Sequence, residues 1–280
     1  MKFSLIVATV GRTSELHRLL TSLDDQTYKN FELIVVDQNL DDRLENVIAS
    51  FCDRLTIIHL TSPLGVSRAR NAGIQKITGD IVGFPDDDCW YPHDLLQNVI
   101  RLLEQGHCDG VTGRVISQDG QVSAYSRFDE TTGLVSLTNV WRRTCTFTIF
   151  LKRKVLETIG GFDEMMGPGA GTPWVGGEDI DYPVRAIRAG FNILYLPEIQ
   201  VFHPNPFDQG LEGMAKRAYT YGAGIGRVWK KHHFPLWFIA YYLIRPLGGA
   251  LVSLITGEWA KAYYHWNALC GRFEGWRSKV

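Results

Sequence analysis

Residues 3–20 read FSLIVATVGRTSELHRLL, the pattern of a β-strand followed by an amphipathic helix. Residues 3–8 form an apolar run of strand length, Gly11 ends that run, and residues 14–20 have the apolar spacing of a helix. A strand that is apolar on both faces is typical of a parallel sheet covered by helices. This stretch therefore predicts an α/β protein whose sheet begins near the N-terminus.

The alternation of apolar runs and helical patterns continues along the chain. We expect further strands at residues 31–36, 55–60, 81–84, 110–116, 121–127, 144–151 and 191–196. We expect helices at residues 41–51, 67–76, 94–104, 152–159 and 178–189, and a mobile loop rich in Gly and Pro at residues 165–177. Ligands of parallel sheets bind beyond the carboxyl ends of the strands, which draws attention to Thr9, Asp37 and Asp86.

Residues 211–280 differ from the rest of the chain in composition. They read as helices and hold ten Lys and Arg against three Asp and Glu, with five of the eight Trp. The net charge of the whole chain is −1, which gives no sign of a nucleic-acid partner. A basic, aromatic segment suits an anionic membrane surface. We therefore predict a catalytic domain over residues 1–210 and a membrane-associated helical tail over residues 211–280.

The most apolar part of this tail, residues 234–256, is interrupted by Arg245-Pro246 and Gly248-Gly249. A membrane-spanning helix needs about 20 apolar residues in a row, and an Arg at mid-membrane costs a few kcal/mol. We favour a pair of helices that lies on the membrane or re-enters it over a full span, with a buried helical pair as the alternative. The cluster Lys230-Lys231-His232-His233 either meets anionic headgroups or ends a helix in water.

The cysteines and the N-terminus bear on the compartment. Five cysteines are scattered without a C-x-x-C pair, which disfavours a disulfide framework and a zinc site and fits a reducing cytosol. The N-terminal apolar run turns polar at residues 9–12 and is too short for a signal peptide. We therefore expect the tail to meet the cytoplasmic face of the cell membrane, in a peripheral or monotopic manner.

Three consecutive carboxylates, Asp86, Asp87 and Asp88, follow the strand expected at residues 81–84. Adjacent carboxylates repel one another unless water or a cation offsets their charge. Mg²⁺ and Mn²⁺ prefer hard oxygen ligands, commonly one or two carboxylates together with substrate phosphates. The pattern predicts a divalent metal site, with a solvated acidic turn as the alternative.

A second acidic pair, Glu178 and Asp179, stands at the start of an expected helix behind the Gly-rich loop. A helix N-terminus favours the ionised form of a carboxylate, and a carboxylate in the right place can accept the proton of an attacking hydroxyl. The pair therefore predicts a general base, although the same residues would also cap the helix.

Six short motifs occur in order along the chain. They are IVATVGR at residues 6–12, LIVVD at 33–37, GVSRARNAG at 65–73, FPDDD at 84–88, GFDE at 161–164 and GED at 177–179. Together they make roughly the first 205 residues resemble the family 2 glycosyltransferases of the bacterial surface-polysaccharide type. The resemblance implies the GT-A nucleotide-diphospho-sugar transferase fold, with a mainly parallel, Rossmann-like sheet, followed here by a C-terminal helical extension.

The resemblance also implies how the donor would be held. Thr9 and Asp37 would hold the nucleotide base and ribose, and Arg70 would reach the base or the diphosphate. The remaining donor contacts would come from Arg12, Asp86 and Asp87.

Metal binding and catalysis fall to other residues of the same motifs. Asp88 would be the direct ligand of Mn²⁺ or Mg²⁺, with Asp86 beside it and nearer the donor sugar. Asp179 would be the catalytic base of an inverting transfer, and Glu178 would support it or bind acceptor hydroxyls.

Two residues outside these motifs are further candidates. His203, after the last expected strand, would complete the metal site or contact the diphosphate, or would be a structural histidine at a turn. Trp174, in the loop before Glu178, would stack on an acceptor sugar or anchor the loop.

The expected reaction moves a single sugar from a nucleotide-diphosphate sugar, commonly a UDP-sugar in this family, to a saccharide or lipid-linked saccharide in polysaccharide or glycolipid synthesis. No Q-x-x-R-W motif follows Asp179, which disfavours a processive synthase. Residues 9–12 contain one Gly, whereas a nucleotidyltransferase would need a Gly-rich loop there and a dinucleotide oxidoreductase a G-x-G-x-x-G motif. The remaining alternative is a non-catalytic scaffold that binds nucleotide sugars in a membrane glycan-assembly complex.

Overall fold

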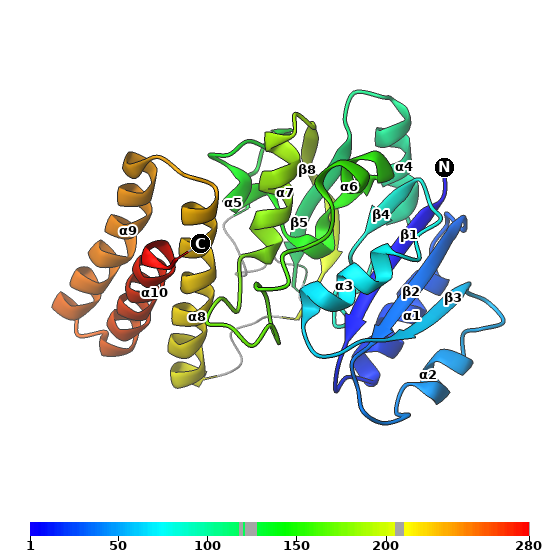
Figure 1. Cartoon of the computed structure of the whole chain (residues 1–280), viewed down its shortest axis with the longest axis horizontal. Helices are drawn as coiled ribbons and strands as arrows, with labels where there is room; N and C mark the ends of the chain where they lie inside the picture. The colour runs from blue at the N-terminus through cyan, green and yellow to red at the C-terminus, as the bar shows by residue number, and fades with distance from the viewer. Residues whose placement is uncertain (118–119, 121–127, 205–209, 280) are drawn as a thin grey trace. The chain divides into compact units, whose positions relative to one another are not determined.

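The computed structural model describes residues 1–117, 120, 128–204 and 210–279 of the chain (Figure 1). Within these residues the strands form one sheet, in the order β3-β2-β1-β4-β7-β5-β8-β6. Its first half is parallel and consists of β1 (Phe3–Thr9), β2 (Phe31–Asp37), β3 (Ile57–Thr61) and β4 (Ile81–Gly83). The parallel sheet expected from the N-terminal pattern is confirmed.

The second half of the sheet is mixed. The strand β7 (Phe150–Lys152) runs antiparallel to both β4 and β5 (Gly110–Ile116). The strand β8 (Ile193–Phe202) runs parallel to β5, and β6 (Gly133–Leu134) lies antiparallel to β8 at the sheet edge. The chain therefore returns to the carboxyl edge of the sheet at the end of β8.

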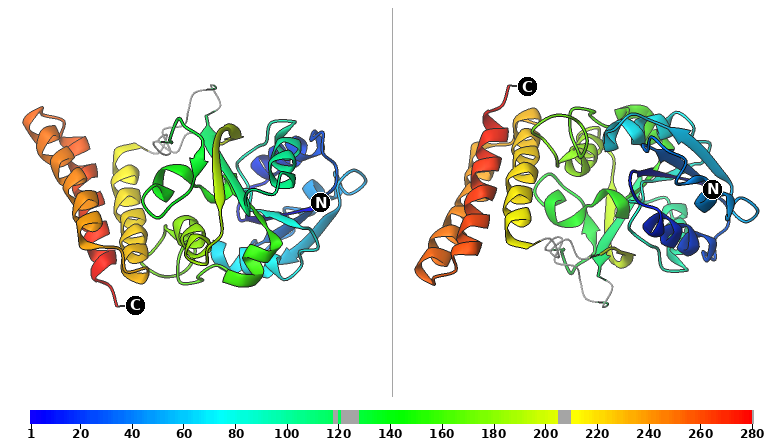
Figure 2. Two further views of the ribbon diagram at one scale, coloured as in Figure 1. Left: turned by 90° about the horizontal axis from the view of Figure 1, so that it is seen from above. Right: turned by 90° about the horizontal axis from the view of Figure 1, so that it is seen from below.

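The helices that accompany the sheet bury apolar faces on it. They are α1 (Ser14–Asp24), α2 (Glu45–Ala49), α3 (Val66–Ile74), α4 (Leu95–Glu104), α5 (Val140–Arg143), α6 (Arg153–Ile159) and α7 (Glu178–Arg188), with the 3₁₀ helix η1 (Thr146–Thr148). The helices α1 and α3 lie on opposite faces of the first strands (Figures 1 and 2). In α1 the buried residues are Leu16, Leu19, Leu20 and Leu23, the helical spacing read from the sequence.

Two expectations fail in this region. The helix expected at residues 41–51 shrinks to the five residues of α2. The strand expected at residues 144–151 is instead η1 followed by β7. The Thr144 hydroxyl donates to the Val140 carbonyl and the Thr148 hydroxyl to the Cys145 carbonyl, each at 2.9 Å, and such local bonds compete with a strand ladder. The strand expected at residues 121–127 lies outside the described residues.

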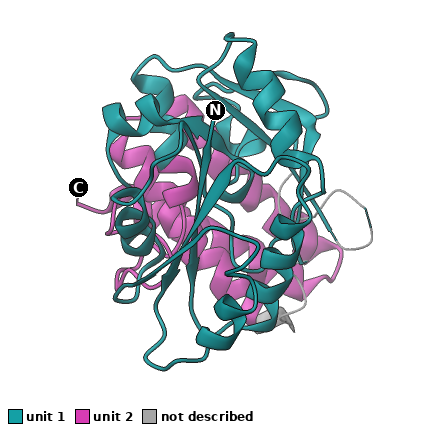
Figure 3. Cartoon of the chain, turned by 90° about the vertical axis from the view of Figure 1, so that its right-hand side faces the viewer, with its two compact units in different colours: residues 1–162, 182–205 teal, residues 163–181, 206–280 magenta. Residues whose placement is uncertain are grey.

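The chain divides into two compact units (Figure 3). Unit 1 contains residues 1–162 and 182–205, and unit 2 contains residues 163–181 and 206–280. The boundary expected at residue 210 separates the C-terminal helices in a similar way, but residues 163–181 group with those helices. The loop expected at residues 165–177 consists of turns and bends and belongs to this second unit.

The described helices of unit 2 pack through glycines. In this unit α10 (Trp259–Arg277) contacts both α8 (Gly210–Lys231) and α9 (Leu236–Ile255), and lies between them (Figures 1 and 2). A Cβ atom at Gly226 would lie 2.1 Å from the Arg272 carbonyl oxygen, and one at Gly275 would lie 1.9 Å from the Ala223 carbonyl oxygen. The backbones of α8 and α10 are therefore in direct contact, as small residues permit.

The helix α9 is continuous, so the pair of helices expected within residues 234–256 is wrong. Pro246 lies inside α9 and has no N–H for the carbonyl of Tyr242, four residues earlier. The Arg272 guanidinium of α10 donates to that carbonyl at 2.8 Å instead. A side chain from the neighbouring helix thus supplies the hydrogen bond that proline removes, and the helix continues through the break.

Candidate nucleotide and metal site

The first two strands end in polar residues that lie side by side. Thr9 and Asp37 are partners at the last paired position of β1 and β2. The Asp37 carboxylate accepts hydrogen bonds from the Asn39 backbone and side-chain amides at 2.8 and 2.7 Å, and its other oxygen lies 3.2 Å from Nε2 of His59. These bonds fix the carboxylate at the carboxyl edge of the parallel strands.

Asp86, Asp88 and His203 form a cluster that can hold a divalent cation. One ligand atom from each residue lies within 4.8 Å of the other two. His203 directly follows β8, and its backbone N–H donates to the Ile116 carbonyl of β5 at 3.0 Å. Its imidazole stacks on Phe147, with ring centroids 4.9 Å apart, and places Nε2 3.1 Å from Oδ1 of Asp88. Two carboxylates and an imidazole fit Mn²⁺, and also Mg²⁺ less closely.

Two arginines offset the charge of the acidic residues. Arg70 from α3 donates to Asp86 at 2.9 Å, and its side chain is 4% exposed. Arg12 contacts Asp87 at 2.5 Å and Asp88 at 2.7 Å, and its side chain is 43% exposed. Arg70 is buried beside Asp86, whereas Arg12 borders solvent and can meet an incoming phosphate.

The pKa values of Asp87, Asp88 and His203 shift in different directions. Burial raises the pKa of Asp87 to about 6, against the charge of Arg12. Burial also acts on Asp88, but the hydrogen bond and charge of His203 lower the pKa of Asp88. For His203, burial is outweighed by the bond and charge of Asp88, so the pKa of His203 is raised. Asp88 is thus held as an ionised carboxylate, the form that a metal ion binds.

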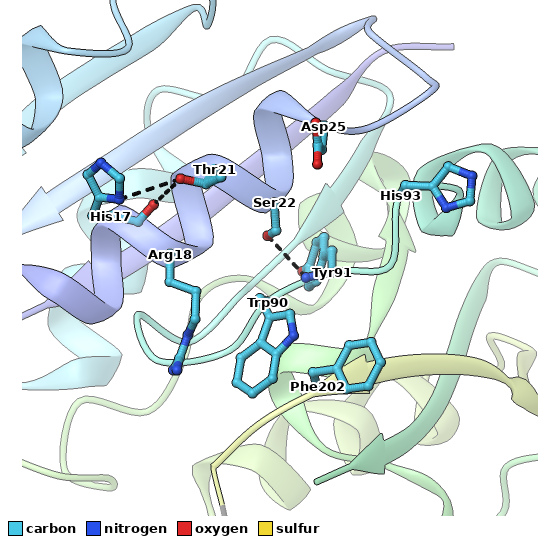
Figure 4. A pocket seen from close by; sticks show the side chains of 9 residues that line it. All are labelled: His17, Arg18, Thr21, Ser22, Asp25, Trp90, Tyr91, His93 and Phe202. Atoms are coloured by element: carbon cyan, nitrogen blue, oxygen red, sulfur yellow. Dashed lines mark hydrogen bonds between the residues drawn. The ribbon is translucent and has the colours of Figure 1, made fainter. Parts of the chain in front are cut away.

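A pocket lies beside the loop that carries Asp86, Asp87 and Asp88, and side chains that line the pocket hold the backbone of this loop (Figure 4). It is lined by His17, Arg18, Thr21, Ser22, Asp25, Trp90, Tyr91, His93 and Phe202. Arg18 of α1 donates to the Asp88 carbonyl at 2.8 Å, and its guanidinium lies 4.1 Å from the centroid of Trp90. Trp90 in turn stacks on Phe202 of β8, with ring centroids 5.4 Å apart. These contacts hold the loop against α1 and β8.

The remaining candidate residues belong to unit 2. Glu178 and Asp179 are the first two residues of α7, after Gly177, whose φ of 92° favours glycine. The side chain of Glu178 is buried and that of Asp179 is half-buried. One face of Trp174 is covered by Arg227, whose guanidinium carbon lies 4.1 Å from the ring centroid. The candidates thus form two sets, one at the strand ends of unit 1 and one around the start of α7.

Some residues that support the site have no clear signal in the sequence. His59 and Arg18 support Asp37 and the Asp88 backbone, but only the strand register and the packing of α1 reveal them. Lys231 and His232 face inward and pair with Asp163 and Asp181, so neither the headgroup nor the solvated interpretation holds for these two residues.

The sequence profile of Glycosyl transferase family 2 matches residues 4–161. The chain belongs to this family. Glycosyltransferase AglE of Haloferax volcanii is 24% identical over 87% of this chain and 82% of its own length. The crystal structure of Staphylococcus aureus TarS residues 1–349 with UDP-GlcNAc superposes with a TM-score of 0.64 at 17% identity, covering 98% of this chain and 91% of that chain.

A second solved structure extends the likeness. Mannosyltransferase PcManGT from Pyrobaculum calidifontis, in complex with GDP-Man and Mn²⁺, superposes with a TM-score of 0.63 at 17% identity, over 97% of this chain and 87% of that chain. These likenesses confirm the GT-A fold expected for the glycosyltransferase. The family assignment confirms that the protein is a glycosyltransferase, as the six motifs predicted.

Proposed function

We propose that this glycosyltransferase is an inverting, metal-dependent enzyme that transfers one sugar from a nucleotide-diphosphate sugar, in the first instance a UDP-sugar, to a saccharide or lipid-linked saccharide. The observation that carries the proposal is the cluster of Asp86, Asp88 and His203 at the strand ends. Mn²⁺ or Mg²⁺ bound there would neutralise charge on the leaving diphosphate. The UDP-GlcNAc and Mn²⁺ complexes of the two related structures support a donor and metal of this kind.

The protein groups around the cluster suit a nucleotide diphosphate. Asp37 presents a buried carboxylate that can accept hydrogen bonds from the base or the ribose hydroxyls. Arg12, exposed on one side and paired with Asp87 and Asp88 on the other, would turn its remaining N–H groups to the diphosphate. Arg70 would keep Asp86 oriented beside the donor sugar.

The proposed base is Asp179. An acceptor hydroxyl must lose its proton as its oxygen attacks the anomeric carbon, and a half-buried carboxylate at the first turn of α7 can take that proton. The new bond forms from the face opposite the leaving diphosphate, so the configuration at the anomeric carbon inverts. Glu178, buried beside Asp179, would support the base or bind acceptor hydroxyls, and Trp174 would stack the face opposite Arg227 on an acceptor sugar.

Calorimetric titration with UDP, dTDP and GDP, each with Mn²⁺ and again with EDTA, tests the donor half of the proposal. We expect one nucleotide to bind with Mn²⁺ and to weaken with EDTA. Asp88→Ala should lose the metal dependence, whereas Asp53→Ala, which removes an exposed carboxylate elsewhere in unit 1, should not. Equal binding with and without metal would contradict the metal site, and no binding of any nucleotide would favour the scaffold alternative.

We also propose that unit 2 places the enzyme on the cytoplasmic face of an anionic membrane. The helix α9 is long and apolar enough to cross a bilayer, and 28% of its most apolar window is buried, unlike a core helix. Its exposed side chains include Trp237, Tyr241, Ile244, Leu251 and Ile255, and those of α10 include Trp259, Tyr263, Trp266 and Phe273. Aromatic and basic residues together are typical of a helix at the membrane interface.

Cosedimentation with vesicles tests this surface. We expect binding to phosphatidylglycerol vesicles to exceed binding to phosphatidylcholine vesicles and to weaken with salt. The double variant Trp237→Glu/Ile244→Glu should lose binding, and Leu40→Glu, which places the same charge on an exposed leucine of unit 1, should keep it. Unchanged binding of the double variant would exclude this face of α9.

A further inference from the structure

The segment Asp163–Asp181, which carries Glu178 and Asp179, is packed along α8. A Cβ atom at Gly224 would lie 1.7 Å from the Gly176 carbonyl oxygen, and one at Gly176 would lie 2.8 Å from the ring of Tyr221. The backbones of the segment and of α8 therefore touch, and side chains at these glycines would separate them. Three residues further along α8, Arg227 covers one face of Trp174. The segment is thus in contact with α8 over several turns.

The end of this contact is a cluster of charged side chains. Nζ of Lys231 lies 2.7 Å from Oδ2 of Asp163 and 2.8 Å from Oδ1 of Asp181. Nε2 of His232 lies 2.8 Å from the same Asp181 oxygen. The Asp181 side chain is 1% exposed, so its charge has little access to water and is stabilised by Lys231 and His232. Asp163 and Asp181 are the first and last residues of the segment, so the cluster closes both of its ends on α8.

The cluster holds a residue near the proposed base on the same helix. Asp181 and Asp179 share the first turn of α7, and residues two apart on a helix point in different directions. Asp181 points inward to Lys231 and His232, while Asp179 remains half-buried. Holding one side chain of a single turn fixes the orientation of the others in it.

We propose that Lys231 and His232 act as a clamp on Asp181, and that this clamp makes Asp181 a positioning residue for the catalytic pair Glu178 and Asp179. The inference rests on the proposed role of Asp179 as the base. It gives the end of α8 a role in orienting the proposed base, in addition to the candidate membrane surface formed by α9 and α10.

A positioning role and a purely structural role make different kinetic predictions. Misplacing a catalytic group by about 1 Å can cost about 100-fold in rate while leaving remote binding intact. A structural role would lower stability and nucleotide affinity along with the rate. The distinguishing readout is therefore kcat against the dissociation constant for UDP or GDP, whose binding the proposed function assigns to unit 1.

The kinetic test uses the full chain with Mn²⁺ and with UDP-GlcNAc or GDP-mannose, and measures release of the nucleotide as the sugar passes to water as the acceptor. We expect His232→Ala to lower kcat by about 10- to 100-fold with the nucleotide dissociation constant within about twofold of the wild type. His232→Gln keeps a side-chain N–H donor and should restore most of kcat. Lys261→Met is the matched control, because it breaks an exposed ion pair with Glu258 in the same unit and should leave kcat unchanged. A kcat of His232→Ala within about twofold of the wild type overturns the clamp.

Hydrogen exchange of the full chain tests the same contacts without turnover. We expect His232→Ala and Asp181→Asn to raise exchange in residues 176–182 and to leave residues 1–117 unchanged. No local increase in either variant overturns the clamp. A wild-type enzyme that turns over neither donor counts against the proposed function, and the exchange measurement then decides alone whether the clamp holds the segment.

Discussion

Each of the two units contains a cluster of carboxylates, and the clusters differ in how exposed their side chains are. In unit 1, Asp88 meets the half-exposed Arg12 and a histidine that can itself bind metal. In unit 2, Asp181 is 1% exposed and is closed by Lys231 and His232. A cluster with accessible atoms and exchangeable partners can accept a ligand, whereas a closed one holds backbone segments together. Under the proposed function, the open cluster would serve donor binding and the closed cluster would orient the proposed base.

The largest expected effect is on transfer itself. Asp179→Asn keeps the shape of the side chain but cannot accept the proton, so the rate of transfer should fall by about 1,000-fold. The dissociation constant for the nucleotide should stay within about twofold, because Asp179 belongs to the acceptor side of the comparison. Transfer rates and calorimetric nucleotide binding, measured on the same preparation, check this. Full activity in Asp179→Asn would refute the assignment of the base.

The glycine contact between α8 and α10 offers a way to break unit 2 selectively. Gly275→Val places a branched side chain where a Cβ atom would already lie 1.9 Å from the Ala223 carbonyl oxygen. We expect unit 2 to lose about 3 kcal/mol of stability, with Gly257→Ala at an open turn costing less. Thermal unfolding, together with metal-dependent UDP binding, checks the result. Loss of UDP binding before unit 2 unfolds would contradict the separation of the two units.

The same Asp-to-Ala substitution in each cluster should have a different effect on nucleotide affinity. Asp88→Ala should weaken Mn²⁺-dependent nucleotide binding by about 10- to 100-fold, because it removes a proposed ligand and the partner of His203. Asp181→Ala should leave that affinity unchanged while lowering kcat. Calorimetry with Mn²⁺ and with EDTA distinguishes the two variants. An equal loss of nucleotide affinity in both would show that the clusters are not functionally distinct.

Glu32 of unit 1 is a buried carboxylate with several hydrogen-bond donors, so it tests whether such a closed carboxylate stabilises unit 1. Burial would raise its pKa, but hydrogen bonds from Lys2, Ser4 and Thr78 lower the pKa of Glu32 to about 2. Because the folded-state pKa lies below the ordinary value of 4.5, this stabilisation is present above pH 4.5 and is lost as the pH falls towards 2.

Glu32→Gln should therefore cost about 1–2 kcal/mol at neutral pH and flatten the loss of stability in acid. Urea unfolding at several pH values measures this, with Glu104→Gln as the control on an exposed residue of the same unit. A wild-type stability that does not change between pH 5 and about pH 3 would contradict the lowered pKa.

Much of unit 1 could be predicted from the sequence. The run at residues 3–8, the helix after Gly11 and the acidic residues at 86–88 are local patterns, and strand and helix periodicity constrain such segments directly. The same patterns place Thr9, Asp37 and Asp86 at or just beyond the carboxyl ends of their strands, and parallel strands share one carboxyl edge. The resemblance to family 2 glycosyltransferases rests on six short motifs, and the family profile over residues 4–161 confirms it.

Several features that depend on residues far apart in the chain were not predicted or were left open between alternatives. Arg272 keeps α9 continuous across Pro246, and neither helix contains a local signal for that bond. His203 reaches Asp88 because β8 pairs with β5, and Lys231 reaches Asp163 because α8 packs on a loop 68 residues away. Periodicity records which face of an element is apolar, but not which partner satisfies a buried charge or carbonyl. The sequence therefore specified the strands and the carboxylates, and long-range packing chose the partners that orient them.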